Sequence, residues 1–205
     1  MDVHKKNKKK VQYSDQDWLE NGEQWIYTCV KRKSYFFTAF SVGKWTQETC
    51  REMILQLPKI IQPPAFTDRL EIFSDGNDDY SFTLPDFFKK DCMNYGQLVK
   101  IRENGRVVNK IRRAIYGHPK IDDIETTDVE NFNGILRERL SRLVRKTKCF
   151  GKKKAHLKNT VQLFQFYWNF MKPLHKKLTP AIMEGQATKV WTWGNFLHKK
   201  LSCTN

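Results

Sequence analysis

The stretch Leu70–Gly76 is the first place in the chain where a side chain could do chemistry. Residues of mainly strand-forming type run into Ser74-Asp75-Gly76, and Gly76 lets the backbone turn away without a side chain in the way. A carboxylate at the carboxyl end of a buried strand is held rigidly while it faces solvent. Sheet proteins place catalytic or metal-binding acids at such positions. Asp75 also fits an ordinary turn aspartate, so a second acid is needed to choose between the two interpretations.

The second acid is Glu130, which lies further along the chain in a basic segment. Thr126 or Thr127 can cap a helix that runs to about Thr147. The apolar face of this helix consists of Val129, Phe132, Leu136, Leu140 and Leu143. At about 100° per residue, Glu130 lies off that face, and the residues on its line are Gly134, Arg137 and Ser141.

Cations surround this predicted helix and continue beyond it. The candidate DNA-binding residues are Arg137, Arg142, Arg145, Lys146, Lys148, Lys152 and Lys153. Each Lys or Arg that neutralises a phosphate adds salt-dependent affinity. The whole chain of 205 residues has a formal net charge of +15, which indicates a polyanionic partner, most directly nucleic acid. A basic surface without a ligand and an anionic membrane surface are the alternatives.

Other features of the sequence narrow the class of protein. No apolar run approaches the roughly 20 residues needed to span a bilayer, and no signal peptide opens the chain. The 5 cysteines are widely spaced without a C-x-x-C pair, which argues against a zinc site and fits reduced thiols. We therefore expect a cytoplasmic protein, associated with the nucleoid when bound to DNA, with neither a membrane nor a small molecule as its partner.

The elements around the two acids predict an α/β fold. Two aromatic-rich strands at 24–30 and 35–42 form an expected antiparallel hairpin. A helix capped by Thr46 and closed by Pro58 follows. After Asp75 we expect a short helix, a strand at 97–101, a turn at 104–105, a basic β-rich stretch at 106–116, the basic helix, a helix at about 154–171, and a short helix beginning with Pro180. The result is a mixed sheet flanked by helices, with its first strand incomplete and a helical C-terminal part.

Asp75 and Glu130 together could bind a divalent metal through hard oxygen ligands. Two metals about 4 Å apart activate a water or hydroxyl and stabilise the leaving oxygen in phosphodiester chemistry. Sequence spacing alone does not show that these two acids meet. If they do, they predict a catalytic site that uses Mg²⁺ or Mn²⁺.

From Trp25 to Gly185 the chain resembles the transposases of the insertion-sequence-one family. The matching stretches are Trp25-Ile26-Tyr27, Val42-Gly43-Lys44, Ser74-Asp75-Gly76, Thr127-Asp128-Val129-Glu130-Asn131-Phe132-Asn133, Arg142 to Lys146, Thr147-Lys148-Cys149-Phe150-Gly151-Lys152-Lys153, Tyr167-Trp168-Asn169-Phe170 and Thr179-Pro180-Ala181. The resemblance implies an RNase H-like catalytic domain with a DDE triad, in which Asp75 is the second acid and Glu130 the third. It also implies metal-dependent DNA cleavage and strand transfer in transposition. The implied partners are terminal-repeat and target DNA, bound by a homo-oligomer.

Two departures from the family pattern bear on activity. The family has arginine after the glutamate, where this chain has Asn131, so a phosphate contact is lost or is made by Arg137. The first acid belongs to a strand of the type Asp-Glu-x-Trp-Ser-Phe-Val, whose end resembles Val3-His4-Lys5-Lys6. That acid would then fall before Met1, because Asp2 is too close to the lysine-rich turn. The zinc-finger and helix-turn-helix segment expected at the amino end of the family is also not in the sequence.

These observations predict three parts of the chain. Residues 1–22 are a basic segment left from the first strand and turn, residues 23–185 the RNase H-like DDE catalytic domain, and residues 186–205 an amphipathic tail. Two functions are expected: a transposase catalytic region, inactive alone if it needs the first acid, or a non-catalytic DNA-binding remnant that modulates the full-length transposase. An RNase H-like nuclease of another kind would need the same missing acid.

Overall fold

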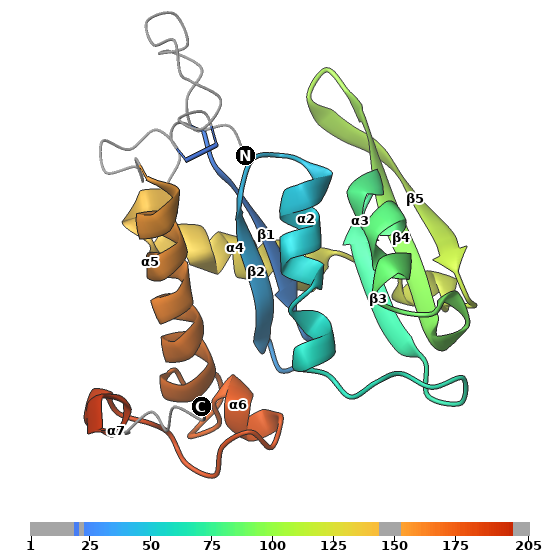
Figure 1. Ribbon diagram of the computed structural model, residues 1–205. Helices are drawn as coiled ribbons and strands as arrows, with labels where there is room; N and C mark the ends of the chain where they lie inside the picture. The colour runs from blue at the N-terminus through green and yellow to red at the C-terminus, as the bar shows by residue number, and fades with distance from the viewer. Residues whose placement is uncertain (1–18, 21–22, 144–152, 199–205) are drawn as a thin grey trace, which may run out of the picture.

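The computed structural model describes residues 19–20, 23–143 and 153–198, which form a mixed α/β fold (Figure 1). The strands are β1 (Trp25–Val30), β2 (Phe37–Gly43), β3 (Leu70–Asp75), β4 (Met93–Glu103) and β5 (Arg106–Tyr116). The helices are α2 (Gln47–Ile54), α3 (Asp78–Thr83), α4 (Thr127–Arg139), α5 (Lys154–Phe166), α6 (Pro180–Met183) and α7 (Trp193–His198). Short 3-10 turns lie at Leu57–Lys59, Leu84–Asp86, Lys90–Cys92, Ile121–Asp123 and Ser141–Leu143, and a π-helical turn at Tyr167–Met171 continues α5.

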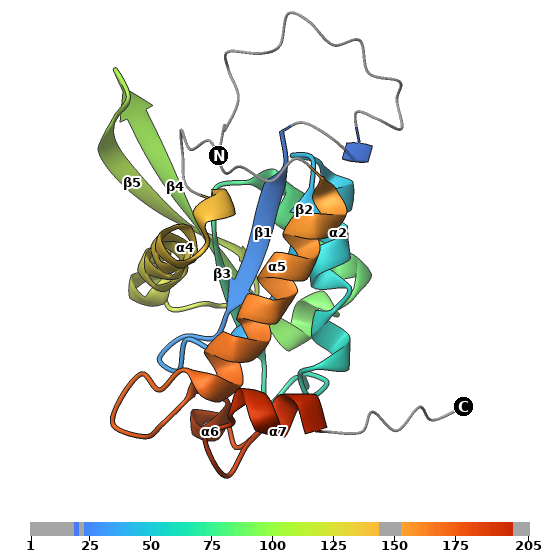
Figure 2. The same ribbon diagram turned by 90° about the vertical axis from the view of Figure 1, so that its left-hand side faces the viewer.

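The first two strands form the antiparallel hairpin that the sequence predicts. Every residue of β2 is buried, because helices cover the hairpin on both faces. Ala39 packs in a core with α2, whereas Phe40 and Val42 pack in a second core with α4 and α5. Figure 2 shows α2 and α4 on opposite sides of the hairpin. The dense apolar composition of the predicted strand is therefore explained by burial on both sides.

The other three strands form a mixed sheet in the order β3-β4-β5. β3 pairs with β4 in parallel, and α3 provides the crossover between them. β4 and β5 form a long antiparallel hairpin. Asn104 and Gly105 make its turn with φ angles of 49° and 78°, as the Asn-Gly signal predicts.

Capping residues begin two of the helices at the predicted positions. The Thr46 hydroxyl accepts a hydrogen bond from the backbone N–H of Thr49 at 3.4 Å. The Thr179 hydroxyl accepts one from the N–H of Ile182, so Pro180 is the first residue of α6. None of the helices in the described part of the chain is long and apolar enough to cross a membrane.

The expected mixed sheet is divided in two. The hairpin β1-β2 and the sheet β3-β4-β5 are separate, and no strand pairing joins β1 to β3 among the described residues. The two sheets nevertheless share a core, since Tyr27 and Ala39 of the hairpin pack in one cluster with Met93 and Tyr95 of β4 and with α2.

The basic helix is shorter than predicted. We expected it to reach about Thr147, but α4 ends at Arg139. Leu140 adopts an extended conformation, with φ −110° and ψ 97°, and the chain then makes the 3-10 turn Ser141–Leu143. This change of direction lets Leu140 and Leu143 pack against the core of α4, α5 and the hairpin. Residues 144–147 lie outside the described part of the chain.

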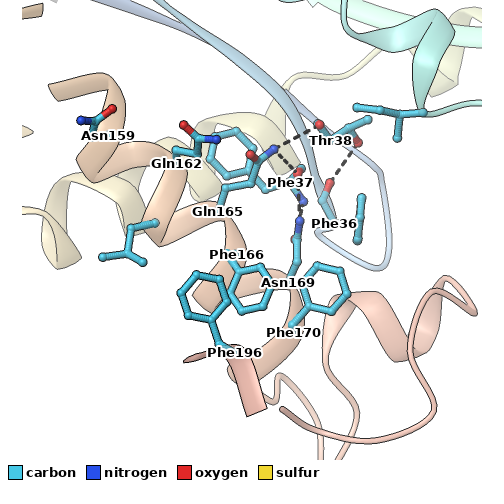
Figure 3. Close-up of a pocket in the computed structure, with 12 residues that line it drawn as sticks. Phe36, Phe37, Thr38, Asn159, Gln162, Gln165, Phe166, Asn169, Phe170 and Phe196 are labelled. Atoms are coloured by element: carbon cyan, nitrogen blue, oxygen red, sulfur yellow. Dashed lines mark hydrogen bonds between the residues drawn. The ribbon is translucent and has the colours of Figure 1, made fainter. Parts of the chain in front are cut away.

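Two amide side chains cover the outer edge of β2 (Figure 3). Asn169 Oδ1 accepts the N–H of Phe37 at 2.9 Å, and Asn169 Nδ2 donates to the Phe37 carbonyl at 3.0 Å. Gln165 Nε2 donates to the carbonyls of Phe37 and Thr38 at 2.9 and 3.1 Å. The Asn169 amide thus pairs with Phe37 much as a neighbouring strand would. Below these amides, Phe166, Phe170 and Phe196 line part of a cavity of about 530 Å³.

We expect Asn169→Ala to lower the free energy of unfolding by roughly 1–3 kcal/mol, because it leaves a buried N–H without its acceptor. The measurement is urea unfolding followed by circular dichroism. Asn159→Ala is the matched control, since Asn159 is an exposed residue of the same helical segment. Equal stability of the two variants would contradict a structural role for the Asn169 amide.

Candidate metal and nucleic-acid site

Asp75 is the last residue of β3, and its surroundings fix the strand end. The hydroxyl groups of Ser74 and Tyr95 are hydrogen-bonded at 2.8 Å, and Gln97 Nε2 donates to the Tyr95 hydroxyl at 2.9 Å. Asp75 Oδ1 accepts the backbone N–H of Asn77 at 3.2 Å. This hydrogen-bonded support leaves Asp75 exposed at the predicted strand tip.

Gly76 packs closely against Val99 of β4. A Cβ atom at this position would lie 3.1 Å from Val99 Cγ2 and 3.4 Å from Val99 Cα. The contact with Cγ2 is tighter than usual, so the Val99 side chain would have to shift slightly to accept a larger residue at position 76. The glycine of the Ser-Asp-Gly stretch therefore lets the chain leave the strand directly against its neighbour.

Glu130 lies in the first turn of α4 and is held by two side chains. The Thr126 hydroxyl, one turn earlier, donates to Glu130 Oε1, and so does the ammonium group of Lys100 from β4. Thr126 occupies the N-cap position, but its side chain makes no capping bond to the helix backbone. The predicted capping residue is thus engaged with the candidate catalytic acid instead.

A single groove brings the two acids together. This inter-sheet groove has a volume of about 770 Å³ and lies between β1 and β3, with α4 along one side. Its lining includes Asp75 and Glu130, together with Lys100 and Thr126. The structure therefore places in one groove two carboxylates that are far apart in the sequence.

The environment shifts the pKa values of the two acids in opposite directions. Desolvation raises the pKa of Asp75, and the nearby charge of Glu130 raises it further, against the opposing effects of the Asn77 N–H and of Lys100. Desolvation alone would also raise the pKa of Glu130, but hydrogen bonds from Lys100 and Thr126 and the charges of Lys100 and Lys110 outweigh it. The net pKa of Glu130 is lowered. Asp75 is thus the acid whose ionisation is disfavoured by its surroundings, and Glu130 the acid whose charge is already stabilised.

The predicted DNA-binding cations divide into three groups. Arg137 and Arg142 line the inter-sheet groove with the two acids. Lys153 is exposed at the start of α5 and is not part of the groove lining. Arg145, Lys146, Lys148 and Lys152 lie outside the described residues.

Among the groove residues that the sequence analysis did not assign to the site, four polar ones lie on β4 or on α4 and its N-cap. These are Lys100, Arg102, Thr126 and Asn133. The register of β3 and β4 explains Lys100: Asp75 is paired with Leu98, and Lys100 follows two residues later on the same face of the sheet. The register between two parallel strands cannot be predicted from local sequence, so the position of Lys100 beside Asp75 is known only from the structure.

The donor set permits a divalent cation. Mg²⁺ is usually held by one or two carboxylates together with waters and substrate phosphates, and Asp75 and Glu130 supply two carboxylates. The described residues contain no group of three or more His, Cys, Asp or Glu side chains that could hold a metal. The Lys100 ammonium is bound to Glu130 in the structure, so a metal at Glu130 would have to replace a cation that is already there.

Comparison with known proteins gives no match to a family model, a curated protein or a solved structure. The functional interpretation therefore depends on the residues and geometry of this chain.

We expect Glu130→Gln to lower the pKa of Asp75 toward its ordinary range. The substitution removes the neighbouring negative charge and frees the Lys100 ammonium, and both changes favour ionised Asp75. The measurement is a ¹³C NMR titration of aspartate carboxyl groups. Glu138→Gln on the exposed face of the same helix is the control and should leave Asp75 unchanged. If the pKa of Asp75 is the same in both variants as in the unsubstituted chain, the two acids do not interact.

Proposed function

We propose that this chain is the RNase H-like catalytic region of a DDE-type DNA transposase. The observation that carries the proposal is the meeting of Asp75 and Glu130 in one groove, beside Arg137 and Arg142. Acidic ligands for a divalent cation next to arginines for phosphates are the two requirements of a metal-dependent site that acts on DNA.

In the proposed reaction, Asp75 and Glu130 would hold Mg²⁺ or Mn²⁺ at the end of β3. When bound, the metal would polarise the scissile phosphate and lower the pKa of the attacking water or 3′-hydroxyl. Water adds to the phosphorus as the P–O bond to one strand breaks, which releases a 3′-hydroxyl. That hydroxyl then attacks a target phosphodiester, so one P–O bond forms as another breaks and the displaced 3′-oxygen takes up a proton.

The chain's own residues would have distinct roles in that reaction. Thr126 keeps the Glu130 side chain oriented through its hydroxyl. Arg137 and Arg142 would position the DNA through its phosphates, because guanidinium groups bind phosphate oxygens in a bidentate way. Lys100 neutralises Glu130 before substrate arrives, which keeps two nearby carboxylates compatible in one groove.

The arrangement of the elements supports the RNase H-like assignment. An antiparallel hairpin lies beside a strand that ends in an acid, and α4, which bears the other acid, passes behind the hairpin in the view of Figure 1. We propose further that the active form is a homo-oligomer bound to terminal-repeat and target DNA, and that it acts in the cytoplasm on the nucleoid.

The second candidate is a non-catalytic DNA-binding remnant that modulates full-length transposase. The ion pair between Lys100 and Glu130 favours this alternative, because it satisfies the charge of Glu130 without a metal.

Strand transfer on terminal-repeat DNA with Mn²⁺ tests catalysis. We compare the 205-residue chain with a chain extended upstream by a strand of the type Asp-Glu-x-Trp. We expect Glu130→Gln to reduce the activity of whichever chain is active by at least about 100-fold. Glu138→Gln should retain activity. If only the extended chain is active, the 205-residue chain is the non-catalytic DNA-binding remnant. Activity that survives Glu130→Gln would make the acid assignment wrong.

DNA binding as a function of salt tests the arginines separately. Removing one phosphate contact lowers the slope of log K against log[salt] by about one, so Arg137→Ala should show this change in filter binding. The control is Arg139→Ala, since Arg139 lies on the same helix but does not line the groove. If the two variants have the same slope, Arg137 does not contact a DNA phosphate.

A further inference from the structure

The ammonium group of Lys100 acts on both candidate acids. Lys100 Nζ donates to Glu130 Oε1, and all three side chains, with Asp75, line the inter-sheet groove. Desolvation raises the pKa of Asp75, and the charge of Lys100 acts in the opposite direction by favouring the ionised form. A cation from the chain itself therefore serves the two carboxylates that a divalent cation would serve.

Lys110 of β5 is the direct cross-strand partner of Lys100 of β4. Side chains opposite one another lie on the same face of a sheet with Cβ atoms about 4.5–5.5 Å apart, and like charges in this arrangement repel each other. The face is the one toward α4, which lies beside the β4–β5 hairpin (Figure 2). Desolvation raises the pKa of Glu130, whereas hydrogen bonds from Lys100 and Thr126 and the charges of Lys100 and Lys110 lower it. Glu130 is thus the counter-ion of both lysines.

The ion pair between Lys100 and Glu130 is one that can open. The exposed fractions of the two side chains are 20% and 50%, so another cation can approach Glu130 from solvent. Ion pairs that reach solvent contribute little to stability, and the flexible stem of lysine lets its ammonium group turn to another acceptor. The Thr126 hydroxyl also donates to Glu130 Oε1, so the carboxylate keeps a support when the ammonium leaves.

We propose that Lys100 is an exchangeable counter-ion, and that it forms with Lys110 a phosphate-binding pair that becomes available when a divalent cation binds Glu130. This inference rests on the proposed function, because the phosphate is one of the DNA backbone. When Mg²⁺ or Mn²⁺ neutralises Glu130, two neighbouring ammonium groups lose the carboxylate that they share. A phosphate that binds both lysines replaces that negative charge.

Cation binding and DNA binding then reinforce each other. The cation alone leaves Lys100 and Lys110 without their counter-ion, and DNA alone competes with Glu130 for the two lysines. With neither ligand, or with both, Glu130 and the lysines have opposite charges beside them. Thermodynamic linkage requires that DNA raise the affinity for the cation by the same factor as the cation raises the affinity for DNA.

Binding of Mn²⁺ in the absence of DNA, followed by electron paramagnetic resonance of the free ion, tests the exchange. Lys100→Met removes the competing cation while it keeps a long side chain, so we expect Mn²⁺ to bind roughly fivefold more tightly. Lys100→Arg keeps the charge and should bind Mn²⁺ as the unsubstituted chain does. Arg113→Met is the matched control, since Arg113 is exposed on the other face of β5.

A second variant keeps this test decisive if Lys100→Met does not fold. Lys110→Met changes an exposed residue and should also tighten Mn²⁺ binding, by a smaller factor, because Lys110 acts on Glu130 through its charge. The proposal is overturned if both lysine variants bind Mn²⁺ as Arg113→Met does, or if no variant binds Mn²⁺.

DNA binding as a function of salt tests the phosphate contact. In EDTA, Lys100→Met should leave the slope of log K against log[salt] unchanged, because Glu130 already neutralises this lysine. In saturating Mn²⁺ the same substitution should lower the slope by about one. In a Glu130→Gln chain it should lower the slope by about one even in EDTA, because the carboxylate that holds the ammonium is gone.

The results distinguish this inference from the proposed function. Absence of DNA binding in every variant would contradict both. A slope that does not depend on Lys100 in any of these conditions would overturn the inference alone. An equal loss of slope in EDTA and in Mn²⁺ would also overturn it, because Lys100 would then bind phosphate without any exchange. Neither measurement requires strand transfer, so an inactive chain that gives the expected results would contradict only the catalytic function.

Discussion

The ring of Phe132 anchors α4 to the rest of the fold, and the candidate site depends on that contact. Its centroid lies 4.8 Å from that of Phe37 in β2 and 5.4 Å from that of Trp168, and the side chain is fully buried. Because Phe132 must face this core, Glu130, two residues earlier, is rotated by about 200° to the other side of the helix. There it reaches Lys100 of β4. Hydrogen bonds from Thr28 to Asn133 and from Tyr35 to Asp128 fix the helix against the first hairpin.

The pKa values of the two acids shift in opposite directions because the charged groups around them differ. Glu130 projects from a helix toward cations of β4 and β5, so its charge is compensated. At the end of β3, desolvation and the nearby charge of Glu130 disfavour the ionised form of Asp75. A folded-state pKa above the unfolded value means that this carboxylate reduces stability as the pH rises through that pKa. A cation bound beside Asp75 would remove part of that cost, which couples ligand binding to stability at this strand tip.

Local chemistry predicted most of the elements. The bounds of β1, β3 and β5 were close to those expected, and Thr46 and Pro180 begin their helices as the sequence indicates. The early end of α4 was not predicted, because the apolar spacing continues through Leu143, and its direction there is decided by packing rather than by propensity. The separation of the sheets and the role of Lys100 were missed for a related reason. Both depend on pairing and register between strands that are distant in the sequence.

The π-helical turn Tyr167–Met171 makes the number of residues in this segment structurally important. A π turn holds one residue more than an α turn over a similar distance, and this shifts the phase of every side chain that follows it. In the present phase, Trp168 and Asn169 face the first hairpin, while the carbonyl of Phe170 accepts the backbone N–H of Trp191 on the far side. A chain shorter by one residue here would keep nearly the same composition, yet would turn different groups toward each neighbour. The contacts of this segment with the first hairpin and with Trp191 therefore depend on the number of residues in the turn as well as on their types.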